Sequence, residues 1–325
     1  MSRTSPASIC VVSVASLDRN LAFYRDVIGL DPSPVETLEG AAFTRHWHLP
    51  AGSSARAALL RHPASEVGRI LLVEFDRPGE NVRGPALTRQ FLGLWNLNFY
   101  TTEIERASRE LAGHGCPSWT EPTRYAISGE TGAPTEVIVD GPEGIIFNLV
   151  QPQGPPDTLV GQVRAFLDER GTTRTGYSEV VTTAHQVDSM EAALAFYRDG
   201  LGLEVWLDEQ FGQEASNRFL DLPLDGRTRI VFMKGDHLFG KVALAQPVNY
   251  TLPNFAPRME APAVGYLAMG FEVDDVDGMV GRVCDVGATV YSPPDELTLP
   301  GLGLRRAALV RTPGSGALSL LVGRG

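Results

Sequence analysis

The stretch LAFYRDVIGL, at residues 21–30, returns almost unchanged as LAFYRDGLGL at residues 194–203. The two copies lie 173 residues apart in a chain of 325 residues. A ten-residue match at this separation indicates that the second half of the chain is a copy of the first. Each copy spaces its apolar residues as a helix does and reaches a glycine, which predicts helices over residues 17–29 and 190–202.

A weaker repeat lies inside each half. The segment FYTTEIE at 99–105 matches FEVDDVD at 271–277, and both alternate apolar and polar residues before an acidic turn and a helix-like segment that ends in glycine. The chain therefore contains four modules of about 86 residues, each with a strand, a helix and three short strands. Their first strands begin near Ile9, Asn96, Thr182 and Ala268, at spacings of 87, 86 and 86 residues. The sequence predicts an α+β protein of four βαβββ modules.

The longest connection runs between the two halves. It carries the turn-rich sequence QPQGPP and then a helix-like segment at 160–170. We therefore expect an N-terminal paired-module barrel over 7–151, a linker over 152–177 and a C-terminal paired-module barrel over 178–323. The pairing itself stays open, because module one can close with module two or exchange with module four.

Charge and cysteine content narrow the range of partners. The chain has 39 acidic and 28 basic residues, a net charge of −11, and no run of Lys or Arg, which argues against nucleic acid and anionic membranes. No apolar stretch approaches the ~18–20 residues that a membrane span needs. The three scattered cysteines indicate neither a disulfide framework nor a thiolate zinc site. We expect a cytoplasmic protein, monomeric or homodimeric, that binds a small molecule.

The four modules, with the motif Phe-Tyr-Arg-Asp-x-x-Gly-Leu opening modules one and three, resemble the vicinal oxygen chelate superfamily. This is the group of glyoxalases, bleomycin-resistance proteins and extradiol dioxygenases. The resemblance covers residues 7–151 and 178–323, and it implies two eight-stranded, half-open barrels whose cups hold the ligand. Enzymes of this family usually bind a divalent metal through His or Glu on the first strand of a module and Glu on the last.

The positions that match those metal ligands hold other residue types. On the first strands they are Ile9, Asn96, Thr182 and Ala268, and on the last strands they are Glu74, Asn148, Ala243 and Ser319. Only Glu74 is an ordinary metal ligand. The sequence therefore predicts that the metal triad is absent from both halves and that the protein uses neither a metal nor another cofactor.

Polar residues point to a substrate site in the N-terminal cup. If the first strand of module two faces the cup, its period of two places Asn96, Asn98 and Tyr100 inside, with Asn148 nearby. Module one would add Ser13, and the neighbouring Trp95 would suit stacking on a flat ligand. These residues are our candidates for substrate binding. The alternative is that the asparagines hydrogen-bond to one another and only fill the barrel.

Four residues are candidates for catalysis. His46 and His48 lie two apart in RHWHLP, so on a strand they would share a face and could form an acid/base couple near neutral pH. The plainer interpretation is a rim strand with solvated histidines. Glu74 either faces solvent or is the inward acid of the cup, and Tyr100 either donates a hydrogen bond to a carbonyl or enolate oxygen or simply fills the barrel.

The leading functional hypothesis is a metal-independent enzyme, a lyase, isomerase or cyclase, that acts by acid/base chemistry on a partly apolar or aromatic metabolite. One alternative is a protein that sequesters an antibiotic or metabolite without turnover. The other is a metal-dependent extradiol-type dioxygenase or glyoxalase-like isomerase with ligands drawn from His46, His48 and Glu74.

Overall fold

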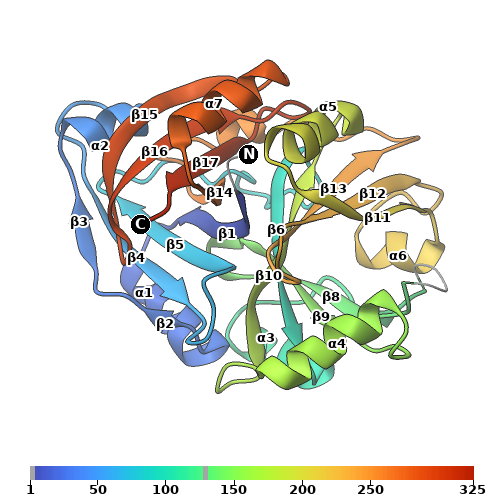
Figure 1. Cartoon of the computed structure of the whole chain (residues 1–325). Coiled ribbons are helices and arrows are strands. Elements are labelled where there is room, and N and C mark those ends of the chain that lie inside the picture. Colours follow the sequence, from blue (N-terminus) through green and yellow to red (C-terminus); the bar gives the residue numbers. More distant parts are fainter. Residues whose placement is uncertain (1–3, 127–130) are drawn as a thin grey trace.

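The fold consists of two strongly curled sheets that pack side by side (Figure 1). It comes from a computed structural model that describes residues 4–126 and 131–325. The first sheet contains nine strands within this described part: β1 (Thr4–Ser13), β2 (Asp31–Pro32), β3 (Glu36–Leu38), β4 (Ala55–Arg61), β5 (Arg69–Phe75), β14 (Gly265–Val273), β15 (Thr289–Leu299), β16 (Gly303–Arg311) and β17 (Leu318–Gly323). Eight of them follow one another in the order β15-β16-β17-β14-β1-β5-β4-β2, and β3 pairs with β4.

The second sheet has the order β11-β12-β13-β10-β6-β9-β8-β7, which is eight strands of the described chain. Their bounds are β6 (Gly93–Thr101), β7 (Thr123–Arg124), β8 (Thr135–Asp140), β9 (Ile146–Gln151), β10 (Tyr177–Gln186), β11 (Glu204–Phe211), β12 (Thr228–Lys234) and β13 (Lys241–Pro247). The prediction of an α+β chain of four βαβββ modules that form two half-open barrels is confirmed.

Short helices connect the strands. They are α1 (Leu17–Phe23), η1 (Tyr24–Ile28), α2 (Ala41–His46), α3 (Ile104–Gly113), η2 (Pro142–Gly144), α4 (Leu159–Arg170), α5 (Met190–Leu194), η3 (Ala195–Gly200), α6 (Glu214–Phe219), η4 (Ala256–Arg258) and α7 (Val276–Asp285). The helices expected over 17–29 and 190–202 correspond to α1 with η1 and to α5 with η3. Gly29 ends the first of them with φ +85°, a left-handed conformation that favours glycine. No helix of the described residues is long and apolar enough to cross a membrane.

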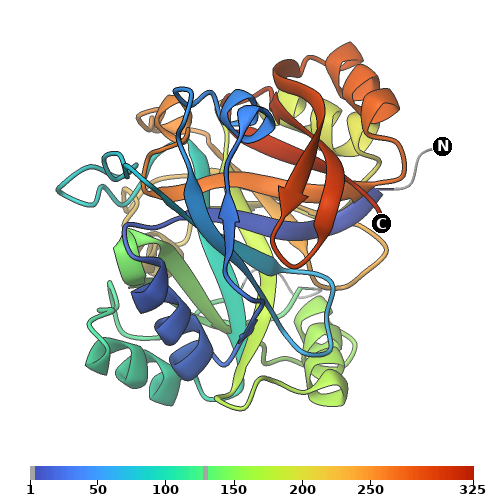
Figure 2. The ribbon, with the colours of Figure 1, turned by 90° about the vertical axis from the view of Figure 1, so that its left-hand side faces the viewer.

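Each sheet combines modules from both halves of the chain. The first strands of modules one and four, β1 and β14, pair antiparallel in one sheet, and those of modules two and three, β6 and β10, pair antiparallel in the other (Figure 2). Module one thus pairs with module four, and the expectation that 7–151 and 178–323 each form a separate barrel is wrong. The β1–β14 pairing requires glycine at 270, because a Cβ at that position would lie 2.9 Å from Cβ of Ile9.

The repeated motif holds the two sheets together. Tyr24, from the helix of module one, contacts Phe147 on β9 of the second sheet, with ring centroids 6.0 Å apart. Tyr197, at the equivalent position of module three, contacts Phe271 on β14 of the first sheet at 6.2 Å. Both tyrosines are fully buried. Consecutive modules of one half therefore pack against each other through a helix, although their strands belong to different sheets.

The linker over 152–177 contains α4, as the helix-like segment at 160–170 predicted. Thr158 caps the helix by accepting a hydrogen bond of 3.0 Å from the backbone N–H of Gly161. A side chain on Gly161 would collide with the carbonyl oxygen of Pro155, so the helix needs glycine in its first turn. Residues 159–170 of this segment thus form a helix that packs on the second sheet (Figure 1).

Candidate functional site

The concave face of the second sheet forms a cavity that opens to solvent. Its volume is about 1150 Å³ when the space at the opening is included. Alternate residues of the central strands face it, because side chains on a strand point to opposite faces in turn. On β6 these are Asn96, Asn98 and Tyr100, as the period of two predicted, and on β13 they include Lys241 and Ala243. The cavity belongs to modules two and three, so the cup that we assigned to the N-terminal half draws on both halves.

The wall of the cavity is mostly apolar and rich in aromatic rings. Six of these rings belong to Trp95, Tyr125, Trp206, Phe211, Phe219 and Phe232. Two side chains of the linker helix, Val160 and Val163, also reach the cavity. Among the described lining residues only Glu136 and Lys241 carry a formal charge. A wall of this kind suits a small molecule with an apolar or aromatic body and a few polar groups.

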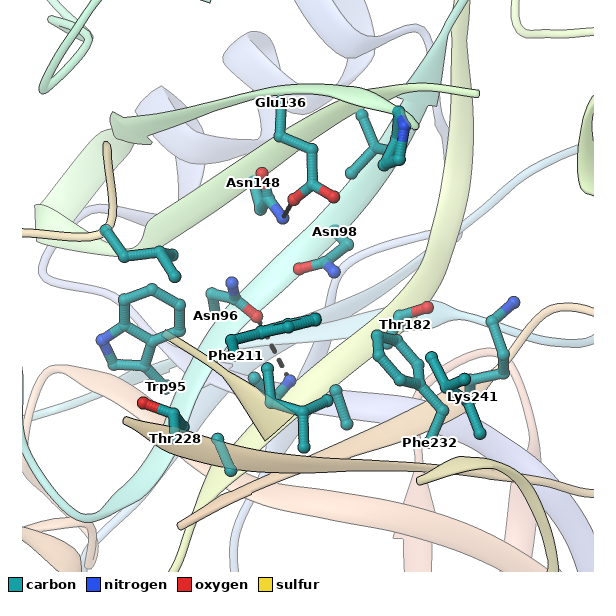
Figure 3. A pocket seen from close by; sticks show the side chains of 18 of the residues that line it. Trp95, Asn96, Asn98, Glu136, Asn148, Thr182, Phe211, Thr228, Phe232 and Lys241 are labelled. Atoms are coloured by element: carbon teal, nitrogen blue, oxygen red, sulfur yellow. Dashed lines mark hydrogen bonds between the residues drawn. The ribbon is translucent and has the colours of Figure 1, made fainter. Parts of the chain in front are cut away.

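A row of four polar residues crosses the floor of the cavity. Strand register places Lys241 of β13 beside Thr182 of β10, Thr182 opposite Asn98 of β6, and Asn98 beside Asn148 of β9. Figure 3 shows Asn98 between Asn148 on one side and Thr182 and Lys241 on the other. The Oδ1 atoms of Asn98 and Asn148 are buried and have no hydrogen-bond partner within the described chain. Buried amide oxygens are normally satisfied, so these two are free to accept from a ligand.

Glu136, on β8, provides the acidic group of the cavity. Its Oε1 accepts a hydrogen bond of 2.9 Å from the hydroxyl of Tyr125, and its Oε2 accepts one of 2.6 Å from Nδ2 of Asn148. Burial raises the pKa of Glu136, although both hydrogen bonds act in the opposite direction because they favour the charged form. A buried carboxyl with a raised pKa and two hydrogen-bond donors on it is a candidate for proton transfer in this cavity.

Lys241 provides the basic group and is 1% exposed. Its Nζ donates a hydrogen bond of 2.5 Å to the carbonyl oxygen of Leu238 and lies 5.2 Å from the ring centroid of Trp206 and 5.8 Å from that of Tyr100. No carboxylate of the described residues pairs with it. Burial, with a smaller repulsion from Lys234, lowers the pKa of Lys241 to about 7.

Five of the residues selected from the sequence line this cavity together: Trp95, Asn96, Asn98, Tyr100 and Asn148. Asn96 is engaged by the protein, because its Oδ1 accepts a hydrogen bond of 3.2 Å from the backbone N–H of Ala184. The indole N–H of Trp95 donates to the carbonyl oxygen of Arg89 at 2.7 Å, which fixes the ring in the wall. Burial raises the pKa of Tyr100, so its hydroxyl stays protonated.

The two candidate histidines lie outside the cavity, and they do not share the face of a strand. His46 ends helix α2, and His48 follows in a turn with φ +53° and stacks on Tyr291 at 4.0 Å between ring centroids. His46 is 2% exposed, and both of its ring nitrogens lack a partner among the described residues. Burial lowers the pKa of His46 to about 3. The assignment of an acid/base couple in the cup is therefore wrong, because residues 41–46 form a helix.

Glu74 and Ser13 belong to the first sheet. Glu74 pairs with Arg56 at 3.1 Å across β5 and β4 and does not line the cavity. Ser13 is fully buried at the end of β1, also away from the cavity. Next to Glu74, Phe75 points to the other face of β5, where Phe43 stacks on it with ring centroids 6.3 Å apart. Neither Glu74 nor Ser13 can take the role in the cup that we expected.

Glu136 and Lys241 were not among the residues selected from the sequence. Glu136 lies near the start of the strand sequence TEVIVD. An acidic residue in such a strand is normally expected to face solvent, so the sequence offered no reason to place it in the cup. Lys241 opens the segment KVALAQP, in which the comparison with the family singled out Ala243 instead. Two of the positions expected from the family, Thr182 and Asn148, lie in the polar row. On β6 and β13 the row instead contains Asn98 and Lys241, each two residues away from the expected Asn96 and Ala243.

The residues of the row do not fit the divalent metal that the fold family implies. The row supplies two amides, one hydroxyl and one amine, without imidazole or carboxylate, and a lysine ammonium would repel a cation. No three His, Cys, Asp or Glu side chains of the described chain come together in a possible metal site, so His46, His48 and Glu74 do not form one.

Comparison with known proteins agrees with this architecture. Residues 8–149 match the model of the Glyoxalase/Bleomycin resistance protein/Dioxygenase superfamily. Among solved structures, glyoxalase I from Zea mays is similar over 99% of this chain and 93% of its own, with a TM-score of 0.63 and 13% identity. A putative dioxygenase from Bacillus subtilis is similar over 99% and 86%, with a TM-score of 0.57 and 12% identity. No curated protein matches the chain.

Fold and cavity define a four-module protein with two half-open barrels, one of which encloses a small-molecule cup. The match of residues 8–149 to the superfamily model agrees with the resemblance noted in the repeated motif, and the solved structures share the fold over the whole chain.

Proposed function

We propose that the cup of the second sheet binds a small, partly apolar or aromatic molecule and moves a proton on it without a metal ion, as a lyase, isomerase or cyclase does. One observation carries the proposal. The Glu136 carboxyl lies in a largely apolar cavity, where Tyr125 and Asn148 hold it and its pKa is raised. Such a group exchanges protons with a bound molecule more readily than a solvated carboxylate does.

The neighbouring groups suit this role. The unpartnered Oδ1 atoms of Asn98 and Asn148 can accept hydrogen bonds from a substrate hydroxyl, and the protonated Tyr100 hydroxyl faces the same cavity. Amide N–H and phenol O–H groups can in turn stabilise an enolate oxygen that forms when a proton leaves an adjacent carbon.

The test uses deuterium oxide. The protein is incubated in it with a mixture of small aromatic and apolar metabolites, and the compound that co-purifies is analysed by mass spectrometry. Wild-type protein is expected to yield a compound that carries deuterium on carbon or has an altered structure. Glu136→Gln is expected to retain the compound without exchange, because an amide cannot take up the proton. Glu74→Gln, in the first sheet, is the matched control and should behave as wild type.

The opposite result would identify a different function. If wild-type protein binds the compound tightly and returns it with unchanged structure and no deuterium, the cup sequesters its ligand and the proposed proton transfer is wrong.

A further inference from the structure

Lysine is almost absent from this chain. The 28 basic residues comprise 26 arginines and only two lysines, Lys234 and Lys241. Nζ of Lys234 lies 3.5 Å from Oε2 of Glu204, and the Lys234 side chain is 29% exposed. Lys234 is therefore an ordinary lysine that forms an ion pair at the surface. Lys241 is the buried residue of the cavity wall. Arginine, which keeps its charge, takes nearly every other basic position, so the amine at 241 stands apart chemically.

The surroundings of Lys241 favour an uncharged amine. Three ring centroids lie near Nζ, those of Trp206 at 5.2 Å, Phe239 at 5.7 Å and Tyr100 at 5.8 Å. They stabilise an ammonium in part, but Nζ donates only to the neutral carbonyl oxygen of Leu238, and no described carboxylate balances the charge. With a pKa of about 7, roughly half of the amine is neutral at neutral pH, whereas a lysine in water is neutral in about one molecule in a few thousand.

We propose that Lys241 is a nucleophile that forms an imine with the carbonyl carbon of an apolar or aromatic aldehyde or ketone bound in the cup. This inference rests on the proposed function and names its substrate class. The neutral amine forms a C–N bond with the carbonyl carbon, whose oxygen takes up a proton. That proton comes from the amine, which gives up its second proton as the C–O bond breaks and the oxygen leaves as water. No electrons are transferred, and hydrolysis reverses the step.

The polar row gives this reaction its setting. Thr182 lies directly beside Lys241, and Asn98 follows it, so a hydroxyl and an amide are available near the amine for the carbonyl oxygen. A protonated imine acidifies the C–H bond next to it, so covalent attachment at Lys241 would promote the loss of a proton from the bound substrate.

The test traps the imine. Full-length protein at pH 7 is mixed with 4-hydroxybenzaldehyde and, in a second series, with phenylpyruvate, and sodium cyanoborohydride reduces any imine to a stable amine. Peptide mapping then compares Lys241, Lys234 and the α-amine. We expect roughly tenfold or more adduct on Lys241 than on Lys234, because its neutral fraction is larger. Lys241→Arg should lose this adduct, and Lys234→Arg, the matched control, should keep it.

The outcomes separate this inference from the proposed function. If both probes give no more adduct on Lys241 than on Lys234, the proposal that Lys241 is a nucleophile is wrong. This conclusion holds even if a probe enters the cup and quenches the fluorescence of Trp95 and Trp206. If deuterium exchange that depends on Glu136 persists in that case, the proposed function stands alone. Glu136→Gln should still trap the imine, because formation of the C–N bond does not require that carboxyl.

Discussion

Nδ2 of Asn148 donates a hydrogen bond to Oε2 of Glu136 at 2.6 Å, across the neighbouring strands β9 and β8. Asn148 stands where the fold family usually carries a metal-binding glutamate, yet here its amide holds a carboxyl on the next strand. The carboxyl of the cup therefore lies on β8, one strand away from Asn148, and accepts hydrogen bonds from the Asn148 amide and the Tyr125 hydroxyl.

Replacing Asn148 by Leu removes this donor while keeping the number and the branching of the heavy atoms in the side chain. We expect the pKa of Glu136 to rise further, because a hydrogen bond that favours its charged form is lost. The free energy of unfolding should fall by about 1–3 kcal/mol at pH 7. Carboxyl ¹³C NMR titration and urea unfolding measure the two effects. Asn98→Leu, which removes no bond to Glu136, should leave that pKa unchanged, and equal shifts in both variants would contradict the assignment.

The buried amine at Lys241 makes folding depend on pH. Its folded pKa of about 7 lies below the ordinary value of 10.5, so between these values the unfolded chain binds more protons and stability rises with pH. The slope is at most about 1.4 kcal/mol per pH unit. Lys241→Met should lack this contribution and exceed wild type in stability most clearly at pH 7 and below. Urea unfolding from pH 6 to 9.5 measures it, and Lys234→Met should retain the wild-type slope.

The buried imidazole of His46 should make the protein sensitive to acid. Its folded pKa of about 3 lies below the ordinary value of 6.5, because burial penalises the charged form. As pH falls from 6.5 towards 3, the unfolded chain takes up a proton that the folded chain does not, so stability decreases. His46→Leu should reduce this loss in thermal unfolding between pH 7 and 4. The exposed His114→Gln serves as control, and an identical acid profile in wild type and His46→Leu would argue against a neutral buried ring.

The pairing of module one with module four can be tested with a disulfide. Val11 and Ala268 lie opposite each other across β1 and β14, and opposed Cα atoms in antiparallel strands are about 4.5–5.5 Å apart, within reach of a disulfide. In a Cys10→Ala background, V11C/A268C should oxidise to a cross-link that joins the two modules in peptide mapping. V11C/L97C, which would link modules one and two, should stay reduced, and the reverse result would refute the observed pairing.

Filling the cup should abolish ligand binding without unfolding the protein. Ala243 and Ala184 lie side by side on the floor, where small side chains leave room for a ligand. Ala243→Phe places a ring in that space, so 4-hydroxybenzaldehyde should no longer quench the fluorescence of the cavity tryptophans. Val205→Phe, at a position that is 45% exposed on the same sheet, should bind as wild type. Equal binding by both variants would show that the ligand lies elsewhere.

The sequence alone determined the module and, for β6, which face of the strand lies toward the cup. The repeat of LAFYRD at 173 residues predicted four copies of one βαβββ unit, and the alternation along β6 placed Asn96, Asn98 and Tyr100 in the cup. These predictions succeed because helical and strand periods depend on near neighbours in the chain. His46 and His48 show their limit, since a six-residue segment carries too little periodicity to distinguish a strand from the helix that it forms.

Tertiary structure alone decided which modules pair and which side chains meet. Four similar modules present similar first strands, so nothing within one module selects its partner. That choice depends on contacts between residues far apart in the sequence, such as Ile9 with Gly270. The same holds for the site, because Glu136 and Lys241 lie 105 residues apart and on different modules. A shift of two residues in register keeps a side chain on its face but changes its neighbours, and only the folded sheet sets that register.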